Sequence, residues 1–476
     1  MDKKVYSIKQ AAIINAVGKY SKVILSIVVE VVLARLLTPH DYGVVAVVTV
    51  FTTFFAIFSD MGLGTAVIQR KDLTKDDINQ IYTFSTYLAL VLAVLFFFAS
   101  YAIAAFYGNK VYVGIGQLLS ISLFFDTMNM VPNGVLNRNK EFVMLAVRTL
   151  VVYVLSVVVT IVLAFFGARY YALVIQSILS SFFTFVWNQK TTKLKFQRKY
   201  NSEPIKQILG YSGFQFLFNL LNYFSRNLDN LLAGKFIGST QLGYYNKAYT
   251  LMQYPVSNLS GVITPVLHPI LSDYQNDKET LYRKYMNVVK LQATVGIWAE
   301  AICIFCGPEI IHIMYGSRWN ESIICFQLLA ISVATQMINS SVGAPLQALG
   351  NTRLLFISGV INTCITVIAI LIGIFSGKTI FSLALWVSLS FIVNFIVSFY
   401  MLIRFGFKKK FSRFIIDMIP YFLVGIVVAT ATAAYPLTIT NSFVSLVVKS
   451  LYITAFFLLV LFLSGEGNTL MRLIRR

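Results

Sequence analysis

The sequence predicts an all-α integral membrane protein with 14 transmembrane helices: two six-helix bundles related by a pseudo-two-fold axis along the membrane normal, and two extra C-terminal helices. Hydrophobic residues make up 57% of the 476 residues and charged residues only 12%, against roughly 25% charged in an average soluble domain. Apolar runs of about 20 residues, the length that crosses a bilayer, recur along the whole chain. The chain also repeats itself. These three observations define the fold class.

The predicted spans end at clusters of glycine, proline and charged residues, which interrupt the apolar runs. The short turn Thr38–Asp41 makes the first two spans a tight helical hairpin. In chain order, we expect spans at 12–37, 42–67, 80–106, 111–136, 142–166, 169–188, 207–237, 241–268, 284–308, 322–349, 353–376, 379–403, 411–434 and 442–464.

These spans divide the chain into four parts. They are the N-terminal six-helix bundle at 1–188, a basic cytoplasmic linker at 189–206, the C-terminal six-helix bundle at 207–405, and helices 13 and 14 with a basic cytoplasmic tail at 406–476. The linker is the largest soluble insert, and the longest loop on the other side covers about 309–321. No loop is long enough to form a domain, which is typical of a transporter.

The basic residues outside the spans fall almost entirely on one side of the predicted membrane. Of the 39 Lys and Arg residues, 26 lie in loops or at span ends on one side, 4 on the other, and 9 farther inside spans. Because cytoplasmic loops carry the excess of Lys and Arg, this division places both termini in the cytoplasm. It also accounts for the net charge of +20. The charge therefore indicates topology and contact with anionic membrane lipids, not a nucleic-acid partner.

An internal repeat relates the two halves at an offset of 200 residues. Arg35 and Gly43 in the first half match Lys235 and Gly243 in the second, with the same spacing of eight. Each half contains six predicted spans, so both have the same orientation. The halves should therefore be related by an axis along the membrane normal, with a substrate path between them.

The first span of each half carries a polar stripe at helical spacing. In the first half the stripe consists of Asn15, Lys19, Lys22, Ser26 and Glu30. In the second half the same five positions plus 200 hold Gln215, Asn219, Asn222, Arg226 and Asn230, with Asp229 beside them. A matched stripe on two related helices is hard to reconcile with contact to lipid, so we expect it to line a cavity.

Three runs of the sequence, Leu33–Phe51, Phe58–Thr74 and Asn222–Pro255, resemble the polysaccharide exporters of the multidrug/oligosaccharidyl-lipid/polysaccharide superfamily, near the teichuronic and colanic acid branch. The resemblance covers roughly residues 10–405 and is weak in the last two spans. It implies two bundles around a central cavity, alternating access, and flipping of undecaprenyl-diphosphate-linked oligosaccharide units. It further implies the bacterial cytoplasmic membrane, with a polysaccharide polymerase and glycosyltransferases as partners.

Charged residues within the spans suggest where such a cargo would bind, because a charge at mid-bilayer costs at least ~2.5–3.5 kcal/mol unless it faces water or a partner. Nine basic and six acidic residues qualify, and the basic excess suits an anionic substrate. Arg226 could hold diphosphate oxygens bidentately, or it could form a structural pair with Asp229. The residues that we expect to contact the diphosphate are Lys19, Lys22, Arg226, Lys247 and Lys290, although Lys247 and Lys290 could instead snorkel to an interface.

Three carboxylates could couple transport to an ion gradient: Glu30, Asp60 and Asp229. An ionised carboxylate holds a neighbouring cation, and a protonated one releases it to the cargo. A permanent ion pair that only offsets burial is the alternative for Asp229 and for Glu30. We expect no cofactor and no metal. The run from Gly373 to Thr379 is one residue short of a P-loop and follows no strand, so nucleotide hydrolysis within the chain is not expected.

Three other function classes fit the sequence less well than a flippase. A membrane glycan polymerase or ligase would need a sizeable outside loop for catalytic groups, and none is present. A cation-coupled multidrug exporter of the same superfamily would favour an acidic cavity. A channel or scaffold does not account for the repeat with charged stripes. The sequence therefore predicts a transporter and not an enzyme.

Overall fold

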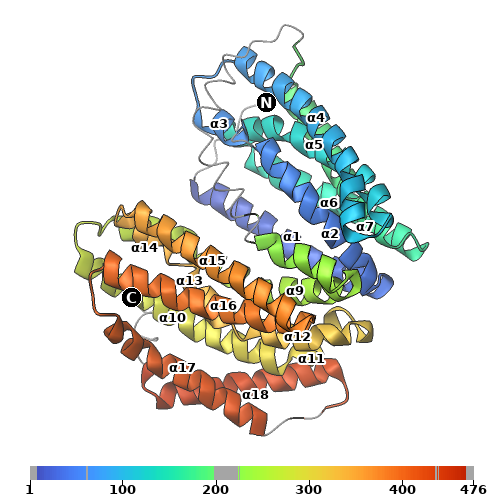
Figure 1. Cartoon of the computed structure of the whole chain (residues 1–476). Helices are drawn as coiled ribbons and strands as arrows, with labels where there is room; N and C mark the ends of the chain where they lie inside the picture. Colours follow the sequence, from blue (N-terminus) through green and yellow to red (C-terminus); the bar gives the residue numbers. More distant parts are fainter. Residues whose placement is uncertain are drawn as a thin grey trace. The chain divides into compact units, whose positions relative to one another are not determined.

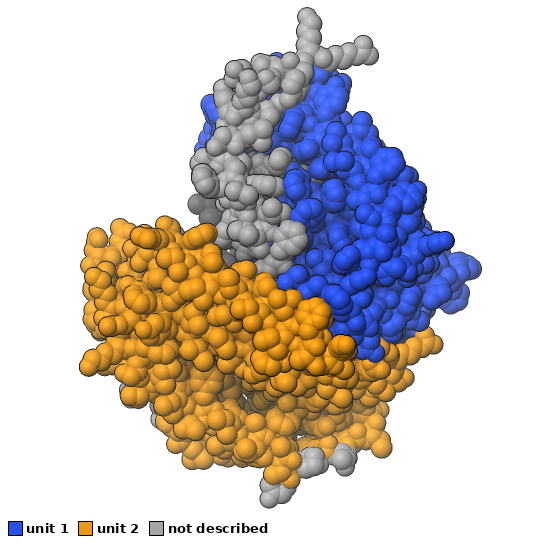
Figure 2. Space-filling view, viewed as in Figure 1, with its two compact units in different colours: residues 1–243 blue, residues 244–476 orange. Residues whose placement is uncertain are grey.

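The computed structural model of the chain describes residues 8–60, 63–197, 223, 226–434, 437 and 439–467. Within this part every regular element is a helix (Figure 1). The chain forms two compact units, Met1–Gly243 and Tyr244–Arg476 (Figure 2). This boundary falls later than the predicted boundary between the two bundles, because residues 226–236 and the start of the next helix group with the first unit. The predicted division by repeat remains a prediction.

The first unit is built mainly of long apolar helices joined by short turns. Its described helices are α1 (Ile8–Leu36), α2 (Pro39–Asp60), α3 (Leu63–Gln69), α4 (Lys75–Tyr107), α5 (Val111–Arg138), α6 (Phe142–Phe165) and α7 (Tyr170–Thr192), followed by a helical stretch at 226–236. Helix α5 packs against α4 and α7, and α6 packs against α1 and α7. The predicted span 42–67 corresponds to two helices, α2 and α3. The other bounds agree within about five residues.

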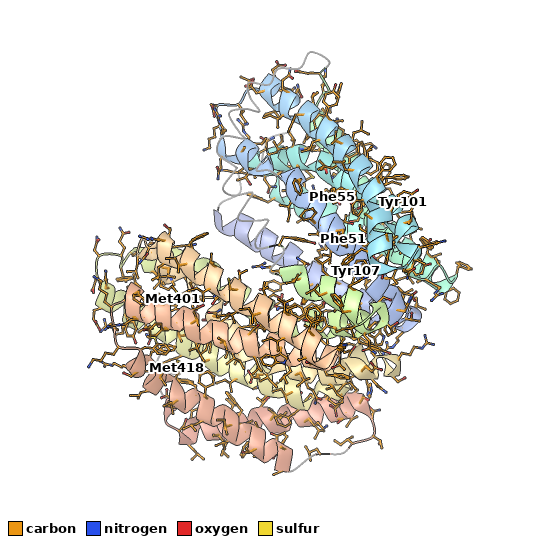
Figure 3. All side chains as sticks on the ribbon, viewed as in Figure 1. Phe51, Phe55, Tyr101, Tyr107, Met401 and Met418 are labelled. Carbon is orange, nitrogen blue, oxygen red and sulfur yellow. The ribbon has the colours of Figure 1, made fainter. Side chains whose placement is uncertain are left out.

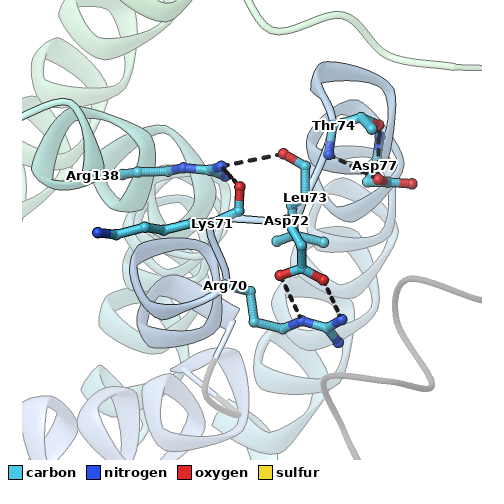
Figure 4. A network of polar contacts seen from close by, with 7 residues as sticks. All are labelled: Arg70, Lys71, Asp72, Leu73, Thr74, Asp77 and Arg138. Atoms are coloured by element: carbon cyan, nitrogen blue, oxygen red, sulfur yellow. Dashed lines mark hydrogen bonds and ion pairs between the residues drawn. The ribbon is translucent and has the colours of Figure 1, made fainter.

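Loops that carry basic residues meet at one end of this unit (Figure 4). Arg138, at the end of α5, donates hydrogen bonds from Nη2 to the carbonyl oxygens of Lys71 (2.9 Å) and Leu73 (3.2 Å). The backbone N–H of Lys195 donates to Asn79 Oδ1 at 3.0 Å. The segments that carry Lys71, Arg138 and Lys195 are predicted to lie on one side of the membrane. These contacts place all three at the same end of the unit, in agreement with that prediction.

The start of α4 shows how the sequence fixes a helix end at this surface. Thr74 and Asp77 form a capping box, in which the Thr74 N–H donates to Asp77 Oδ2 at 2.9 Å and the Asp77 N–H donates to Thr74 Oγ1 at 3.2 Å. Beside it, Arg70 bonds to Asp72 at 2.6 Å, and this hydrogen bond lowers the pKa of the exposed Asp72 carboxyl. At the far end, Gly108 ends α4 with φ 69°, a left-handed conformation that favours glycine.

The second unit holds the remaining helices. They are α9 (Ser239–Ser272, whose first five residues belong to the first unit), α10 (Lys278–Phe305), α11 (Gly307–Met314), η1 (Ser317–Trp319), α12 (Asn320–Ala330), α13 (Val333–Asn339), α14 (Gly343–Ala348), α15 (Thr352–Gly377), α16 (Ile380–Met401), the π-helical turn η2 (Leu402–Gly406), α17 (Phe411–Ala434) and α18 (Ser442–Leu463). Helix α10 is central and packs against α12, α13, α17 and α18. The hydrophobic core of the second unit includes Met401 and Met418 (Figure 3).

The predicted span 322–349 is broken into α12, α13 and α14. The segments Ser317–Ala330 and Val333–Ala348 are bent by 49°. Glu300 of α10 lies beside the break, and its Oε2 accepts the backbone N–H of Ala334 at 3.0 Å. One turn earlier on α10, Gly296 allows close approach, because a Cβ there would lie 2.9 Å from Ala334 Cα. The Glu300 side chain thus accepts a hydrogen bond from a backbone N–H that the break leaves without a helical partner.

Helix α18 packs onto the rest of the second unit through polar contacts. Trp298 Nε1 of α10 donates to Thr454 Oγ1 of α18 at 3.0 Å. Lys449 Nζ of α18 lies 2.6 Å from Glu309 Oε1 of α11. Helices α17 and α18 were predicted as an addition outside the repeat, and these contacts show how one of them is attached.

Ten helices in the described part of the chain are long and apolar enough to cross a membrane, or eleven if the bent pair is one span. Helices α1 and α9 match predicted spans but are not among the ten, and both carry several polar and charged residues. Most of the predicted span 207–237 lies outside the described residues. The chain is therefore a multi-pass membrane protein, and the count of 14 remains a prediction.

Candidate functional site

A reciprocal contact joins the start of α2 to the start of α9 within the first unit. A Cβ on Gly43 would lie 1.6 Å from the carbonyl oxygen of Ser239, and a Cβ on Gly243 would lie 1.9 Å from that of Pro39. Ser239 is the repeat counterpart of Pro39, and Gly243 is that of Gly43. The contact is therefore reciprocal: Gly43 of the first half approaches Ser239 of the second, and Gly243 of the second half approaches Pro39 of the first. Only glycine allows the two backbones to approach this closely.

Aromatic residues extend this contact toward the helical stretch 226–236. Tyr107 of α4 donates from its hydroxyl to the carbonyl oxygen of Leu231 at 2.9 Å. Its ring packs edge-on against Phe51 of α2, with the centroids 6.2 Å apart (Figure 3). A Cβ on Gly234 would lie 2.8 Å from Val47 Cγ2. The stretch that carries Arg226 is therefore held against α2 and α4.

The first polar stripe lies on α1. Lys22 is exposed, and its Nζ lies 5.9 Å from the centroid of the Tyr153 ring of α6. Ser26 donates from Oγ to the Val23 carbonyl oxygen of its own helix at 2.7 Å. Glu30 is half-buried and has an interaction partner. Asn15 and Lys19 lie in α1, but their side chains are outside the described part.

The second stripe is described only in part, because Gln215, Asn219 and Asn222 lie outside the described residues. Arg226 is exposed and forms no ion pair within the described part of the chain. Asp229 is 5% exposed, and its Oδ1 accepts the N–H of Asn230 at 2.8 Å. The two side chains therefore differ in environment, and the pairing of Arg226 with Asp229 that the sequence left open is not formed here.

The remaining predicted site residues are more scattered. Lys247 of α9 is 5% exposed, with its Nζ 5.6 Å from the ring centroid of Tyr315. Lys290 is half-buried on α10. Both lie in the second unit, whereas Lys22 and Arg226 lie in the first. Asp60 is the last residue of α2, and its side chain is outside the described part.

A buried polar network in the first unit was not assigned a role from the sequence. Arg148 of α6 is 8% exposed and donates from Nη1 to the side-chain oxygens of Asn188 and, at 3.3 Å, Asn133. Asn188 Nδ2 donates in turn to Asn129 Oδ1 at 2.9 Å. The polar residues of α5 recur at helical spacing on one face, at positions 122, 126, 129 and 133. This spacing is the sequence signal from which the network could have been predicted. Neutral amide oxygens here solvate a charge that is buried among helices.

Comparison with known proteins gives a consistent result. The model of one protein family, described as polysaccharide biosynthesis protein, matches residues 32–324. The chain is 26% identical over 307 residues to the teichuronic acid biosynthesis protein TuaB of Bacillus subtilis, covering 64% of each chain. It is 23% identical over 414 residues to the lipopolysaccharide biosynthesis protein WzxC of Escherichia coli, covering 84% of this chain and 82% of that one.

Two solved structures are similar in fold. A lipid II flippase MurJ in an inward closed conformation matches with a TM-score of 0.73 and 16% identity, covering 94% of this chain and 98% of that one. An inward-facing multidrug resistance transporter of the MATE family matches with a TM-score of 0.64 and 16% identity, covering 80% and 94%. At these identities the likeness concerns the fold alone.

Proposed function

The chain belongs to the polysaccharide biosynthesis protein family, and we propose that it flips lipid-linked oligosaccharide repeat units from the cytoplasmic to the outer leaflet. The cargo would be a glycan on undecaprenyl diphosphate, destined for a surface polysaccharide. Relatives named for teichuronic acid and lipopolysaccharide biosynthesis support this class of product. The fold it shares with a lipid II flippase supports the class of transport.

The observation that carries the proposal is a pair of exposed cations on the first predicted span of each half. Lys22 and Arg226 lie on the repeat-related stripes, and neither forms an ion pair within the described residues. A cation at membrane depth is costly unless it meets water or an anion. A diphosphate headgroup carries the complementary charge, and an Arg guanidinium binds phosphate oxygens in a bidentate manner. Lys19, Lys247 and Lys290 are proposed as further contacts.

The reciprocal contact of Gly43 and Gly243 supports a pseudo-two-fold relation between the halves. In a symmetric interface residue i contacts j and j contacts i, which is the pattern of Gly43 with Ser239 and Gly243 with Pro39. We propose 14 spans, both termini in the cytoplasm, and alternating access between the halves. The turns at 38–41 and 237–241 would then lie at the outer face, so this contact would close the outer side.

The energy source is proposed to be an ion gradient or removal of the product. Asp229, buried three residues from Arg226, is the best-placed coupling group, with Glu30 and Asp60 as further candidates. A carboxylate that loses its charge would release a cation to the diphosphate, which makes the proton and cargo sites interdependent. Under this proposal the chain uses no cofactor and catalyses no covalent step. A polysaccharide polymerase and glycosyltransferases would act after and before it.

A multidrug exporter is the second candidate, because the fold is also shared with a MATE transporter. A strain that lacks the gene separates the two functions. Loss of flipping should leave lipid-linked repeat units facing the cytoplasm and remove the surface polysaccharide, with drug sensitivity unchanged. Increased drug accumulation with normal polysaccharide would instead identify an exporter.

A further inference from the structure

A groove runs between α6 and α7 on the first unit, and no residue of the polar stripes lines it. It has a volume of about 220 Å³ and is lined mainly by apolar side chains, including Val152 and Leu155 of α6 and Phe183 of α7. Trp187 and Lys190 of α7 line it as well. The two helices are antiparallel, since a short turn joins them and Arg148 near the start of α6 bonds to Asn188 near the end of α7. The groove is therefore apolar along most of its length and polar at the end where Lys190 lies.

The polar end of the groove is basic. Lys190 is exposed and forms no ion pair with any residue in the described ranges. Lys193 and Lys195 lie three and five residues after it, and the backbone N–H of Lys195 bonds to Asn79 at this end. The acidic residues at this end are Glu141, the residue before α6, and Asp76 and Asp77 in the first turn of α4. None of them forms an ion pair with Lys190 in the described part of the chain. The local charge is thus complementary to an anion.

Trp187 marks the depth of this polar end. Its ring is half-buried and lies one turn before Lys190. Trp side chains prefer the boundary between hydrocarbon and headgroups. A ligand in this groove would therefore place an apolar chain along Val152, Leu155 and Phe183 and its polar group at the level of Lys190.

We propose that this groove binds an anionic phospholipid, with one acyl chain along the α6–α7 groove and the headgroup phosphate at Lys190. A linear hydrocarbon chain suits a shallow apolar groove between two spans, and basic residues at the cytoplasmic ends of spans recognise anionic headgroups. In the proposed topology the lipid belongs to the cytoplasmic leaflet. None of the candidate cargo residues lines the groove, so its occupancy does not depend on the proposed function.

The test is quenching of Trp187 fluorescence by brominated lipids, using the full-length protein in lipid nanodiscs. The Trp187 signal is the difference between wild type and Trp187→Phe. Brominated phosphatidylglycerol should quench it at a lower lipid fraction than brominated phosphatidylcholine. Lys190→Gln should raise the half-saturating fraction of phosphatidylglycerol about five-fold, the weakening expected from one basic residue at a lipid surface, and leave phosphatidylcholine unchanged.

Lys110→Gln is the matched control, since it removes the same charge from an exposed loop at the opposite end of the same unit. It should quench like the wild type. Equal quenching by the two lipids in the wild type would overturn the proposal. So would a Lys190→Gln variant that keeps the wild-type response to phosphatidylglycerol, or quenching that is unaffected by Trp187→Phe.

Discussion

Arg226 is the residue on which the proposed binding of diphosphate depends most. Its side chain is exposed, and its helix is held in place by Tyr107 and by the close contact of Gly234 with α2. The guanidinium is thus presented from a fixed backbone. Sequence reasoning identified the residue but could not decide whether Asp229 neutralises it, because three residues of separation on a helix allows a pair without requiring one.

Arg226→Ala should reduce surface polysaccharide about ten-fold or more, since a hydrogen bond to a charged group contributes about 1.5–3 kcal/mol. Arg226→Lys should restore it poorly, because a point charge lacks the bidentate geometry. Polysaccharide is quantified in a deletion strain complemented with each variant at matched membrane levels. Lys235→Ala, on the same helix, is the control and should retain export. Full export by Arg226→Ala would remove the residue from the site.

The buried contacts of Arg148 with its amide partners predict how substitutions there change the stability of the protein. Asn188→Leu removes the acceptor of a buried guanidinium and should destabilise the protein by at least about 1–3 kcal/mol. Removing the charge as well, in Asn188→Leu/Arg148→Met, should recover part of that loss. Thermal unfolding of the purified protein in detergent measures both. If the double variant is less stable than Asn188→Leu, the guanidinium contributes more than these amide contacts explain.

At the scale of elements, most helix bounds follow from the sequence because apolar runs end at turn residues and charges. The break between α12 and α13 does not. No proline or glycine lies between Ala330 and Val333, and the partner of the Ala334 N–H is Glu300 on another helix. Burial of Lys247 likewise depends on neighbours such as Tyr315, which is distant in the sequence. Such features need the tertiary structure.

The glycine contact of α2 with α9 predicts that even a methyl group is not tolerated where the two helices meet. Gly43→Ala and Gly243→Ala should each impair export and lower the melting temperature, because a Cβ would overlap a backbone oxygen that cannot move aside. The effects should be less than additive in the double variant, since one separation of the helices relieves both clashes. Gly359→Ala in α15, where a Cβ would meet nothing within 4 Å, should be tolerated. Equal tolerance at Gly43 would show that the helices separate without consequence.

At the scale of the whole molecule, the basic loops predict its orientation. The repeat offset and the loop charges can be read from the sequence, and cysteine labelling tests the sides of the membrane that they predict. Single cysteines at Lys140 and Lys110 should label from the cytoplasm and from outside, respectively. The labelling background should replace Cys364, which is exposed, whereas Cys303, Cys306 and Cys325 are buried. Labelling of both positions from one side would contradict the span count.

The proposed activity of this chain is the movement of a lipid-linked oligosaccharide across a bilayer. The most direct measurement uses purified protein in liposomes that contain an undecaprenyl-diphosphate-linked oligosaccharide, with transfer between leaflets followed by an impermeant glycan-modifying reagent. Wild-type protein should expose the initially protected half of the substrate much faster than protein-free liposomes do, and Arg226→Ala should not. If the wild type shows no transfer above the protein-free rate, with or without imposed proton or sodium gradients, the proposed function is wrong.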